Sequence, residues 1–232
     1  MDQTAEKLNV YFIPGLGTDR SIFEYLNLHD AYFKVHFLEW IIPENSLESL
    51  QNYAHRMSEQ ITEEHFVLIG ISFGGVIAQE IAKIRVVEKV IIISSIKSKH
   101  ELPRRLRLVK FLKIYQLSPV IGKLNFEKLQ FSGVGKLLKR KLYLYQKYML
   151  VKDKLYLLWA TKNMLYWDQS MADSNLVHIH GTNDQVFPKK YLQNIISIEG
   201  GTHTMILTKA NTISNLINSI LLNNDHKNNT HR

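Results

Sequence analysis

Residues 66–82 read FVLIGISFGGVIAQEIA and contain the clearest structural pattern in the chain. Residues 66–71 form an apolar run, which is typical of a strand buried on both faces of a parallel sheet. Residues 74–84 place apolar side chains on one face at helical spacing, which predicts a helix. The sequence Gly-Ile-Ser-Phe-Gly at 70–74 joins the two elements. Ser72 is therefore predicted to stand on a tight turn between a strand and a helix.

Short apolar runs flank this unit on both sides. They predict five further strands, at 8–13, 34–38, 89–93, 176–180 and 195–198. Helical spacing predicts helices at 46–61, with Ser46 as the N-cap, and at 205–222. Alternating strands and helices favour the α/β class, with a mostly parallel sheet of about six strands.

Residues 95–174 break this alternation. The segment is basic and aromatic, contains no clear buried strand, and predicts helices at 102–115 and 135–165. We interpret it as a helical cap inserted into an α/β core made of residues 1–94 and 175–222. Residues 223–232 are polar and are predicted to form a disordered tail.

The positive charge is concentrated in the predicted cap. Residues 97–154 hold 16 Lys or Arg and 3 Asp or Glu, whereas the net charge of the whole chain is +8. Three interpretations remain open: a solvated helical face, attraction of an anionic substrate, and peripheral contact with anionic lipid. No nucleic-acid recognition motif accompanies the charge, so nucleic acid is not an expected partner.

Composition excludes several classes of protein. The 232 residues include no cysteine, which rules out disulfides, a thiolate nucleophile and cysteine-ligated metals. No stretch approaches 18 uninterrupted apolar residues, so no membrane-spanning helix is expected. The polar, acidic first seven residues do not resemble a secretory signal, and we expect a cytoplasmic protein.

A serine hydroxyl is a poor nucleophile unless a base removes its proton, and that base needs an orienting carboxylate. His203 follows the last predicted strand, and Asp184 follows the strand before it. The carboxyl ends of parallel strands form the edge at which open α/β sheets place their sites. We therefore expect Ser72, Asp184 and His203 to meet there as nucleophile, acid and base.

These motifs resemble those of the α/β-hydrolase superfamily, over roughly residues 8–222. Residues 70–75 resemble its nucleophile elbow, residues 181–184 its acid loop, and residues 201–203 its histidine loop. Residues 14–17, Pro-Gly-Leu-Gly, resemble its oxyanion loop, with Pro14 where histidine is common. The resemblance implies that the oxyanion hole consists of the Leu16 and Phe73 N–H groups. Gly15, Gly70 and Gly74 are expected to support the turns.

The expected activity is hydrolysis of a small carboxylic ester or thioester, which could be anionic, with no metal and no other cofactor. One alternative is a non-catalytic binding protein with this fold, and another is a triad enzyme that cleaves a carbon–carbon bond. His178 and His180 alternate on one predicted strand, but no third metal ligand accompanies them, so structural roles are expected. Asp19 is expected to cap a helix that begins near residue 21.

Overall fold

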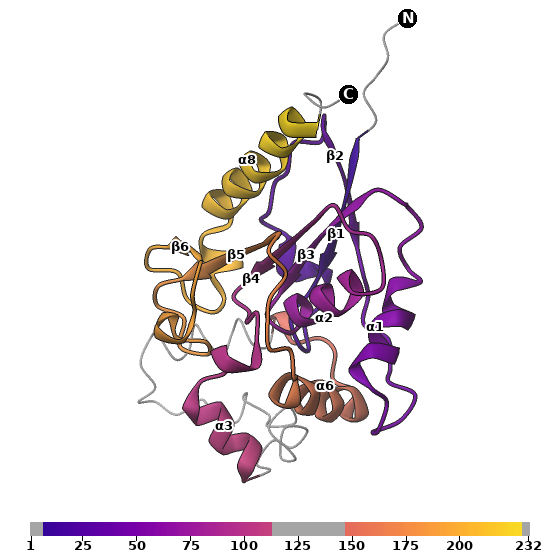
Figure 1. Cartoon of the computed structure of the whole chain (residues 1–232), viewed down its shortest axis with the longest axis vertical. Helices are drawn as coiled ribbons and strands as arrows, with labels where there is room; N and C mark the ends of the chain where they lie inside the picture. Colours follow the sequence, from indigo (N-terminus) through magenta and orange to yellow (C-terminus); the bar gives the residue numbers. More distant parts are fainter. Residues whose placement is uncertain (1–6, 113–146, 229–232) are drawn as a thin grey trace, which may run out of the picture.

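A six-stranded sheet forms the centre of the protein (Figure 1). The computed structural model describes residues 7–112 and 147–228. All neighbouring strands are parallel, in the order β2-β1-β3-β4-β5-β6. The strands are β1 (Leu8–Ile13), β2 (Phe33–Phe37), β3 (Phe66–Ile71), β4 (Lys89–Ile93), β5 (Leu176–Gly181) and β6 (Ile196–Ile198). The predicted α/β class with six strands is confirmed, and the sheet is parallel throughout.

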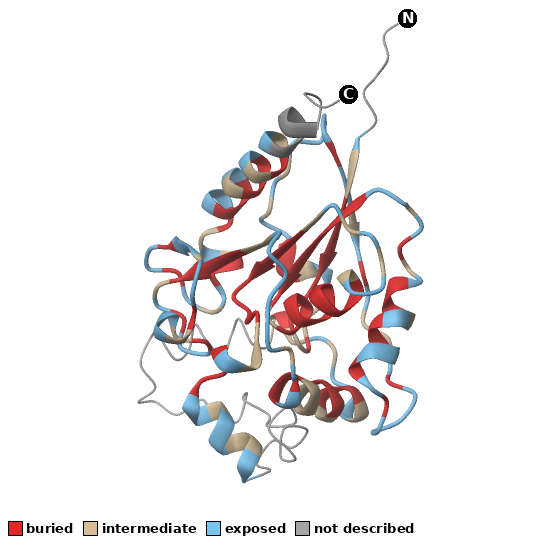
Figure 2. Cartoon of the chain, in the orientation of Figure 1, coloured by how far each residue is buried: buried red, intermediate tan, exposed pale blue. Residues whose placement is uncertain are grey.

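Helices contribute to an apolar core on each face of the sheet. One core combines α1 (Leu50–Ser58), α2 (Phe73–Ala82) and α6 (Lys154–Tyr166) with one face of the strands. The other combines the 3-10 helix η1 (Arg20–Phe23), α7 (Met205–Thr208) and α8 (Ala210–Asn228) with the opposite face. All six residues of β3 are buried, with Leu68 in the first core and Ile69 in the second. Figure 2 shows this burial as a continuous red centre.

The helix predicted over 46–61 is shorter than expected. It begins at Leu50, where the Ser49 side chain accepts a hydrogen bond from the Asn52 N–H. Ser46, the predicted cap, lies in a preceding turn. Both serines stand before apolar residues at helical spacing, so periodicity did not distinguish them. The prediction of Ser46 as N-cap was wrong.

The helix predicted over 135–165 is interrupted in its described part. Residues 149–153 are not helical, and α6 begins at Lys154. The Asp153 side chain caps α6 by accepting a hydrogen bond from the Tyr156 N–H at 2.8 Å. The preceding Val151 N–H donates to the Gly17 carbonyl at 3.0 Å instead of to a helical partner. Residues 135–146 of this prediction lie outside the described residues.

The C-terminal helix is divided and longer than predicted. Met205–Thr208 and Ala210–Asn228 form separate helices, α7 and α8, on either side of Lys209. The second helix continues past residue 222 because no glycine or proline follows to end it. The first six residues of the predicted tail are therefore helical, and residues 229–232 lie outside the described residues.

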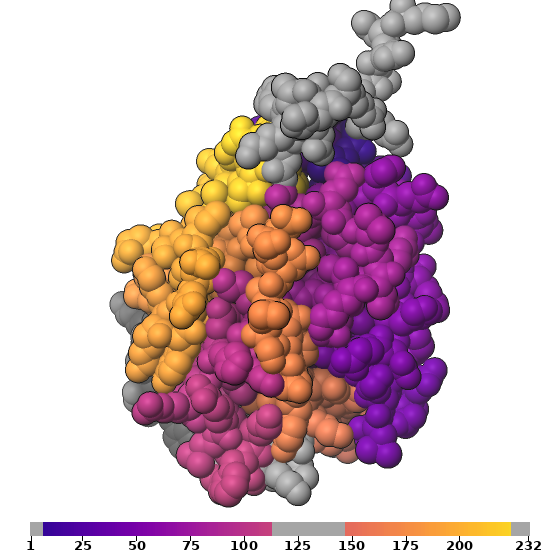
Figure 3. Space-filling view, in the orientation of Figure 1, coloured from indigo at the N-terminus to yellow at the C-terminus, as the bar shows by residue number. Residues whose placement is uncertain are grey.

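The described part of the predicted cap, residues 95–112 and 147–174, includes η2 (Lys99–Glu101), α3 (Arg104–Phe111) and α6. The Lys99 N–H donates to the Gln169 carbonyl at 2.8 Å, and its ammonium group lies 2.6 Å from Asp168. In Figure 3 the magenta and orange surfaces, which include these two segments, lie side by side. Assignment of 95–174 as a cap stays a prediction, since residues 113–146 lie outside the described residues. Within the described ranges, no helix is long and apolar enough to cross a membrane.

Candidate active site

Ser72 occupies a strained turn between β3 and α2. Its φ of 51° and ψ of −117° fall in a backbone region that residues other than glycine rarely adopt. The Ser72 N–H donates to the Ile93 carbonyl at 2.9 Å, and the Ser95 hydroxyl donates to the Ser72 carbonyl at 2.7 Å. These bonds from β4 and the residues after it hold the turn in place. The hydroxyl of Ser72 is thereby presented at the carboxyl edge of the sheet.

Two glycines make this turn sterically possible. A Cβ on Gly70 would lie 2.3 Å from the Gly74 carbonyl oxygen. A Cβ on Gly74 would lie 2.3 Å from the Pro14 carbonyl oxygen. Both approaches involve backbone atoms, which cannot rotate away as a side chain can. The structure thus gives a physical reason for the glycines at both positions.

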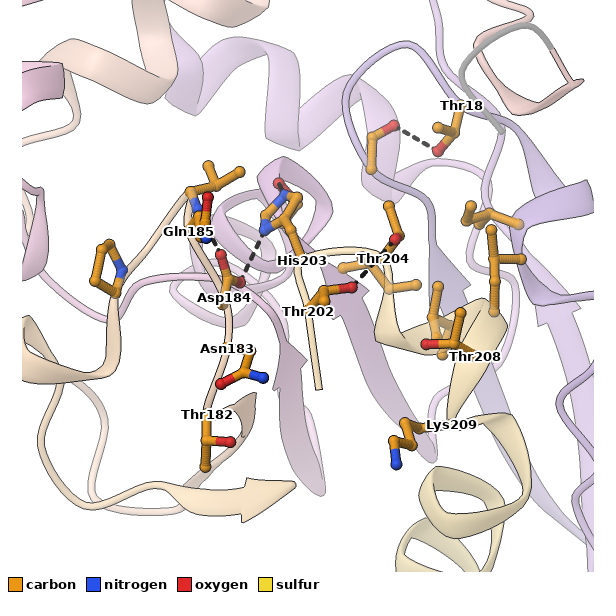
Figure 4. Close-up of a pocket in the computed structure, with 18 of the residues that line it drawn as sticks. Thr18, Thr182, Asn183, Asp184, Gln185, Thr202, His203, Thr204, Thr208 and Lys209 are labelled. Atoms are coloured by element: carbon orange, nitrogen blue, oxygen red, sulfur yellow. Dashed lines mark hydrogen bonds and ion pairs between the residues drawn. The ribbon is translucent and has the colours of Figure 1, made fainter. Parts of the chain in front are cut away.

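Three predicted site residues are connected by hydrogen bonds. His203 Nε2 lies 3.1 Å from Ser72 Oγ, and His203 Nδ1 lies 2.9 Å from Asp184 Oδ2. Figure 4 shows Asp184 and His203 directed toward one another from neighbouring loops. Since a carboxylate only accepts, Nδ1 carries the proton and Nε2 is free to accept the serine proton. This tautomer is the one that a general base next to Ser72 requires.

The Asp184 carboxylate is buried but has several donors. Its side chain accepts hydrogen bonds at Oδ1 from the Val186 N–H at 2.7 Å and the Phe187 N–H at 2.9 Å. Burial raises the pKa of Asp184, but the interaction with His203 and the hydrogen bond from the Phe187 N–H lower it by more. The net pKa lies below the usual value. Asp184 is therefore ionised at neutral pH and can stabilise a charged His203 ring.

A second histidine lies behind Asp184 and was not predicted to be near the site. His180 Nε2 is 2.8 Å from the Phe187 carbonyl oxygen, so it donates there, and it is 3.4 Å from Asp184 Oδ2. His180 Nδ1 lies 3.1 Å from His178 Nε2. Burial lowers the pKa of both histidines, so both are neutral. On β5, His180 lies four residues and His178 six residues before Asp184. Strand alternation alone does not predict that a side chain on the strand contacts an acid in the following loop.

The proposed oxyanion donors lie beside Ser72. Phe73 is the first residue of α2, so its N–H has no partner within the helix. A Cβ on Gly15 would lie 3.7 Å from the Ser72 Cβ, which places the Gly15–Leu16 peptide close to the nucleophile. Within the described residues, neither the Leu16 N–H nor the Phe73 N–H donates to a protein acceptor. Both groups are available to a ligand.

Leu16, Ser72, Asp184 and His203 line a cavity of about 1390 Å³. Its walls come from the loops after β1, β5 and β6, from α3 and from η5 (Lys189–Tyr191). Asp184 is the only acidic side chain among the described lining residues. Four cationic side chains also line the cavity: Arg105, Lys189, Lys190 and Lys209. The cavity therefore has a basic surface around Ser72.

Other predicted residues have structural contacts. Asp19 caps η1 by accepting from the Ser21 N–H at 2.9 Å, as expected. Of the aromatic residues in the predicted cap, Trp159 and Tyr156 are buried in the core, while Tyr148 lines the cavity. The described residues contain no group of three or more His, Asp or Glu side chains able to hold a metal ion.

Comparison with solved structures shows that the chain has a known fold. A carboxylesterase from Nitrososphaera gargenis is 17% identical with a TM-score of 0.62, over 94% of this chain and 91% of its own. An epoxide hydrolase from Bacillus megaterium is 15% identical with a TM-score of 0.64, over 93% of this chain and 94% of its own. A thermophilic esterase from Thermogutta terrifontis is 14% identical with a TM-score of 0.60, over 93% of this chain and 90% of its own.

These similarities define the class: the chain has the α/β-hydrolase fold. Comparison with protein-family models gave no match, and comparison with curated proteins also gave none. The neighbours catalyse more than one kind of reaction, so the fold alone does not assign a substrate.

Proposed function

We propose that this protein is a serine hydrolase that cleaves a carboxylic ester or thioester of a small molecule. One observation carries the proposal: Asp184, His203 and Ser72 form a continuous hydrogen-bonded chain that ends at the strained turn. A serine in a structural role needs neither a free imidazole nitrogen beside it nor an unfavourable backbone conformation.

The proposed reaction begins with proton transfer from Ser72 Oγ to His203 Nε2 as Oγ attacks the substrate carbonyl carbon. The Leu16 and Phe73 N–H groups stabilise the oxyanion, each contributing on the order of 3 kcal/mol to transition-state stabilisation. His203 then protonates the departing alkoxide or thiolate, leaving an acyl group on Ser72. Water attacks the acyl carbon, His203 accepts a proton from that water, and the carboxylic acid leaves as the proton returns to Ser72 Oγ.

We further propose that the preferred substrate carries a negative charge. Arg105, Lys189 and Lys190 are exposed, line the cavity, and form no ion pair within the described residues. The Arg105 guanidinium donates to the Val186 carbonyl at 3.1 Å, but an anion bound near these side chains would not have to displace a carboxylate. This supports an anionic substrate over the interpretation of the basic segment as only a solvated face.

Replacement of the nucleophile tests the proposed activity. We expect Ser72→Ala to lower kcat for p-nitrophenyl acetate by about 10³-fold or more, because no other group supplies the acyl-enzyme step. Ser58→Ala is a matched control, since this buried serine lies on α1 and bonds to the His55 carbonyl. Equal turnover by wild type and a folded Ser72→Ala variant would exclude the mechanism.

A non-catalytic binding role is the main alternative. It predicts a bound ligand but no turnover of ester, thioester or amide substrates in a panel. Cleavage of a carbon–carbon bond without ester turnover would instead favour the third possibility, in which the same triad performs different chemistry.

A further inference from the structure

The carbonyl group of Gly15 accepts hydrogen bonds from three donors. The Trp40 indole Nε1 lies 3.2 Å from this oxygen, the Thr18 N–H lies 3.0 Å away, and the Thr18 hydroxyl lies 2.9 Å away. The bond from the Thr18 hydroxyl is drawn in Figure 4. This carbonyl belongs to the peptide unit that joins Gly15 to Leu16. The N–H of that same unit is the Leu16 donor of the proposed oxyanion hole.

A peptide unit is planar and rigid, and its C=O and N–H point in opposite directions. Bonds that fix the direction of the Gly15 carbonyl therefore also fix the direction of the Leu16 N–H. Hydrogen bonds accepted by a carbonyl also polarise the amide, which strengthens its N–H as a donor. Three donors on one side of the unit thus orient and strengthen the single donor on the other.

Trp40 also contacts the second half of the proposed oxyanion hole. It follows β2 in the chain, and its ring stacks on the Phe73 ring with centroids 5.6 Å apart and an interplanar angle of 25°. The Trp40 ring also contacts the Tyr156 ring of α6, with centroids 5.3 Å apart. One side chain therefore connects the Gly15–Leu16 peptide, the first residue of α2 and the described part of the predicted cap.

We propose that Trp40 is a positioning residue, which together with Thr18 aligns the Leu16 N–H for the oxyanion. The proposal rests on the proposed serine-hydrolase function and extends it to a residue that does not itself contact substrate. Charge appears on the carbonyl oxygen only during the reaction, so a misaligned donor lowers kcat more than it changes KM.

Trp40→Phe tests the proposal, because it retains a ring against Phe73 but removes the indole N–H. Trp159→Phe is the matched control. Trp159 also packs against Phe73, with ring centroids 6.0 Å apart. Its indole N–H donates to the carbonyl of Glu48 at 2.8 Å, two residues before α1 begins. Both variants lose one indole hydrogen bond next to the same aromatic ring.

The measurements are kcat and KM for p-nitrophenyl acetate, and the Ki of a trifluoromethyl ketone, whose adduct with serine carries an oxyanion. We expect Trp40→Phe to lower kcat by about 10-fold or more and to raise Ki by a similar factor, with KM nearly unchanged. Trp159→Phe should leave kcat and Ki within about twofold of wild type. Thr18→Val removes another of the three donors, and the same pattern is expected for it, so the proposal stays testable if Trp40→Phe fails to fold.

Unchanged kcat and Ki in a folded Trp40→Phe or Thr18→Val variant would overturn the positioning role. An equal loss in Trp159→Phe would also overturn it, because it would assign the effect to packing around Phe73. Labelling of wild-type Ser72 by a fluorophosphonate tests the serine-hydrolase proposal independently of these variants. A reactive Ser72 with unaffected variants refutes only the role of Trp40, whereas an unreactive Ser72 refutes both proposals.

Discussion

At the scale of single residues, the buried ionised Asp184 depends on its donors. A carboxylate without partners would be neutral in such a place, because burial disfavours the charged form. Here two backbone N–H groups and His203 donate hydrogen bonds to the charged group. The energetic cost of burying the acid is therefore offset locally. In the proposed mechanism, a charged acid stabilises the His203 ring while it holds the serine proton.

The neutral pair His178 and His180 predicts a specific pH dependence of stability. In the unfolded chain each histidine binds a proton below pH about 6.5, whereas burial keeps both neutral in the fold. Unfolding is then coupled to proton uptake, so stability falls as the pH decreases below that value. The expected loss is about 1.4 kcal/mol per pH unit for each histidine, until the lowered folded pKa is reached.

Urea unfolding at several pH values between about 7 and 5 measures this dependence. We expect His178→Gln to remove about half of the slope of unfolding free energy against pH, because one neutral histidine remains. His55→Gln is the control, since the His55 side chain is exposed and is not part of this buried pair. The lowered pKa of Asp184 affects stability only below this pH range. There, stability falls as the pH decreases through the pKa of Asp184 in the unfolded chain and then through its pKa in the fold. A wild-type slope in His178→Gln would contradict the argument.

At the scale of elements, the strand–turn–helix unit around Ser72 was the most predictable part of the molecule. Its apolar strand, its glycines and its helical face each favour the same local structure, and all were found. Helix boundaries were less predictable, because Ser46 and Ser49 have equivalent patterns. The break before Lys154 depends on the contact between Val151 and Gly17, which lie far apart in the chain.

The same limit applies to the site. The local patterns that predicted Ser72, Asp184 and His203 lie at the ends of strands. They can be recognised in the sequence without knowing how the side chains pack. The contacts of Trp40 and His180 are different, because each joins a side chain to a backbone or acid group on another loop. Periodicity and motif spacing carry no information on such contacts.

The turn predicts a difference between two glycine substitutions. A Cβ at Gly74 would lie 2.3 Å from the Pro14 oxygen and 2.4 Å from the Ile13 oxygen, so Gly74→Ala must displace backbone. We expect a loss of about 1–3 kcal/mol or more in unfolding free energy. Gly15→Ala is the control, because its Cβ would meet no atom closer than 3.5 Å. Equal stability of the two variants in urea would show that the backbone can shift without cost.

At the scale of the whole molecule, cationic side chains lie at both edges of the sheet. Arg105, Lys189 and Lys190 lie around the cavity at its carboxyl edge, whereas Lys7 and Lys89 lie at the opposite edge, where β1 and β4 begin. Attraction of an anion by exposed charges weakens with ionic strength, since the screening length falls from about 30 Å at 0.01 M to about 3 Å at 1 M salt.

We therefore expect kcat/KM for 4-acetoxybenzoate to exceed that for the neutral 4-acetoxybenzamide at low salt, and the difference to shrink as salt is added. Combined Lys189→Gln and Lys190→Gln replacement should reduce the preference. Combined Lys7→Gln and Lys89→Gln replacement removes the same charge at the other edge and should not. A preference for the anionic ester that does not change with salt concentration, or that both double variants reduce equally, would argue against an anionic substrate.

Reaction with a fluorophosphonate probe, followed by peptide mapping, tests the activated serine most directly. The wild-type protein should be modified at Ser72 alone, and His203→Ala should react far more slowly because its serine has no base. Absence of labelling, labelling at another serine, or equal rates in wild type and His203→Ala would contradict the assignment of Ser72 as nucleophile.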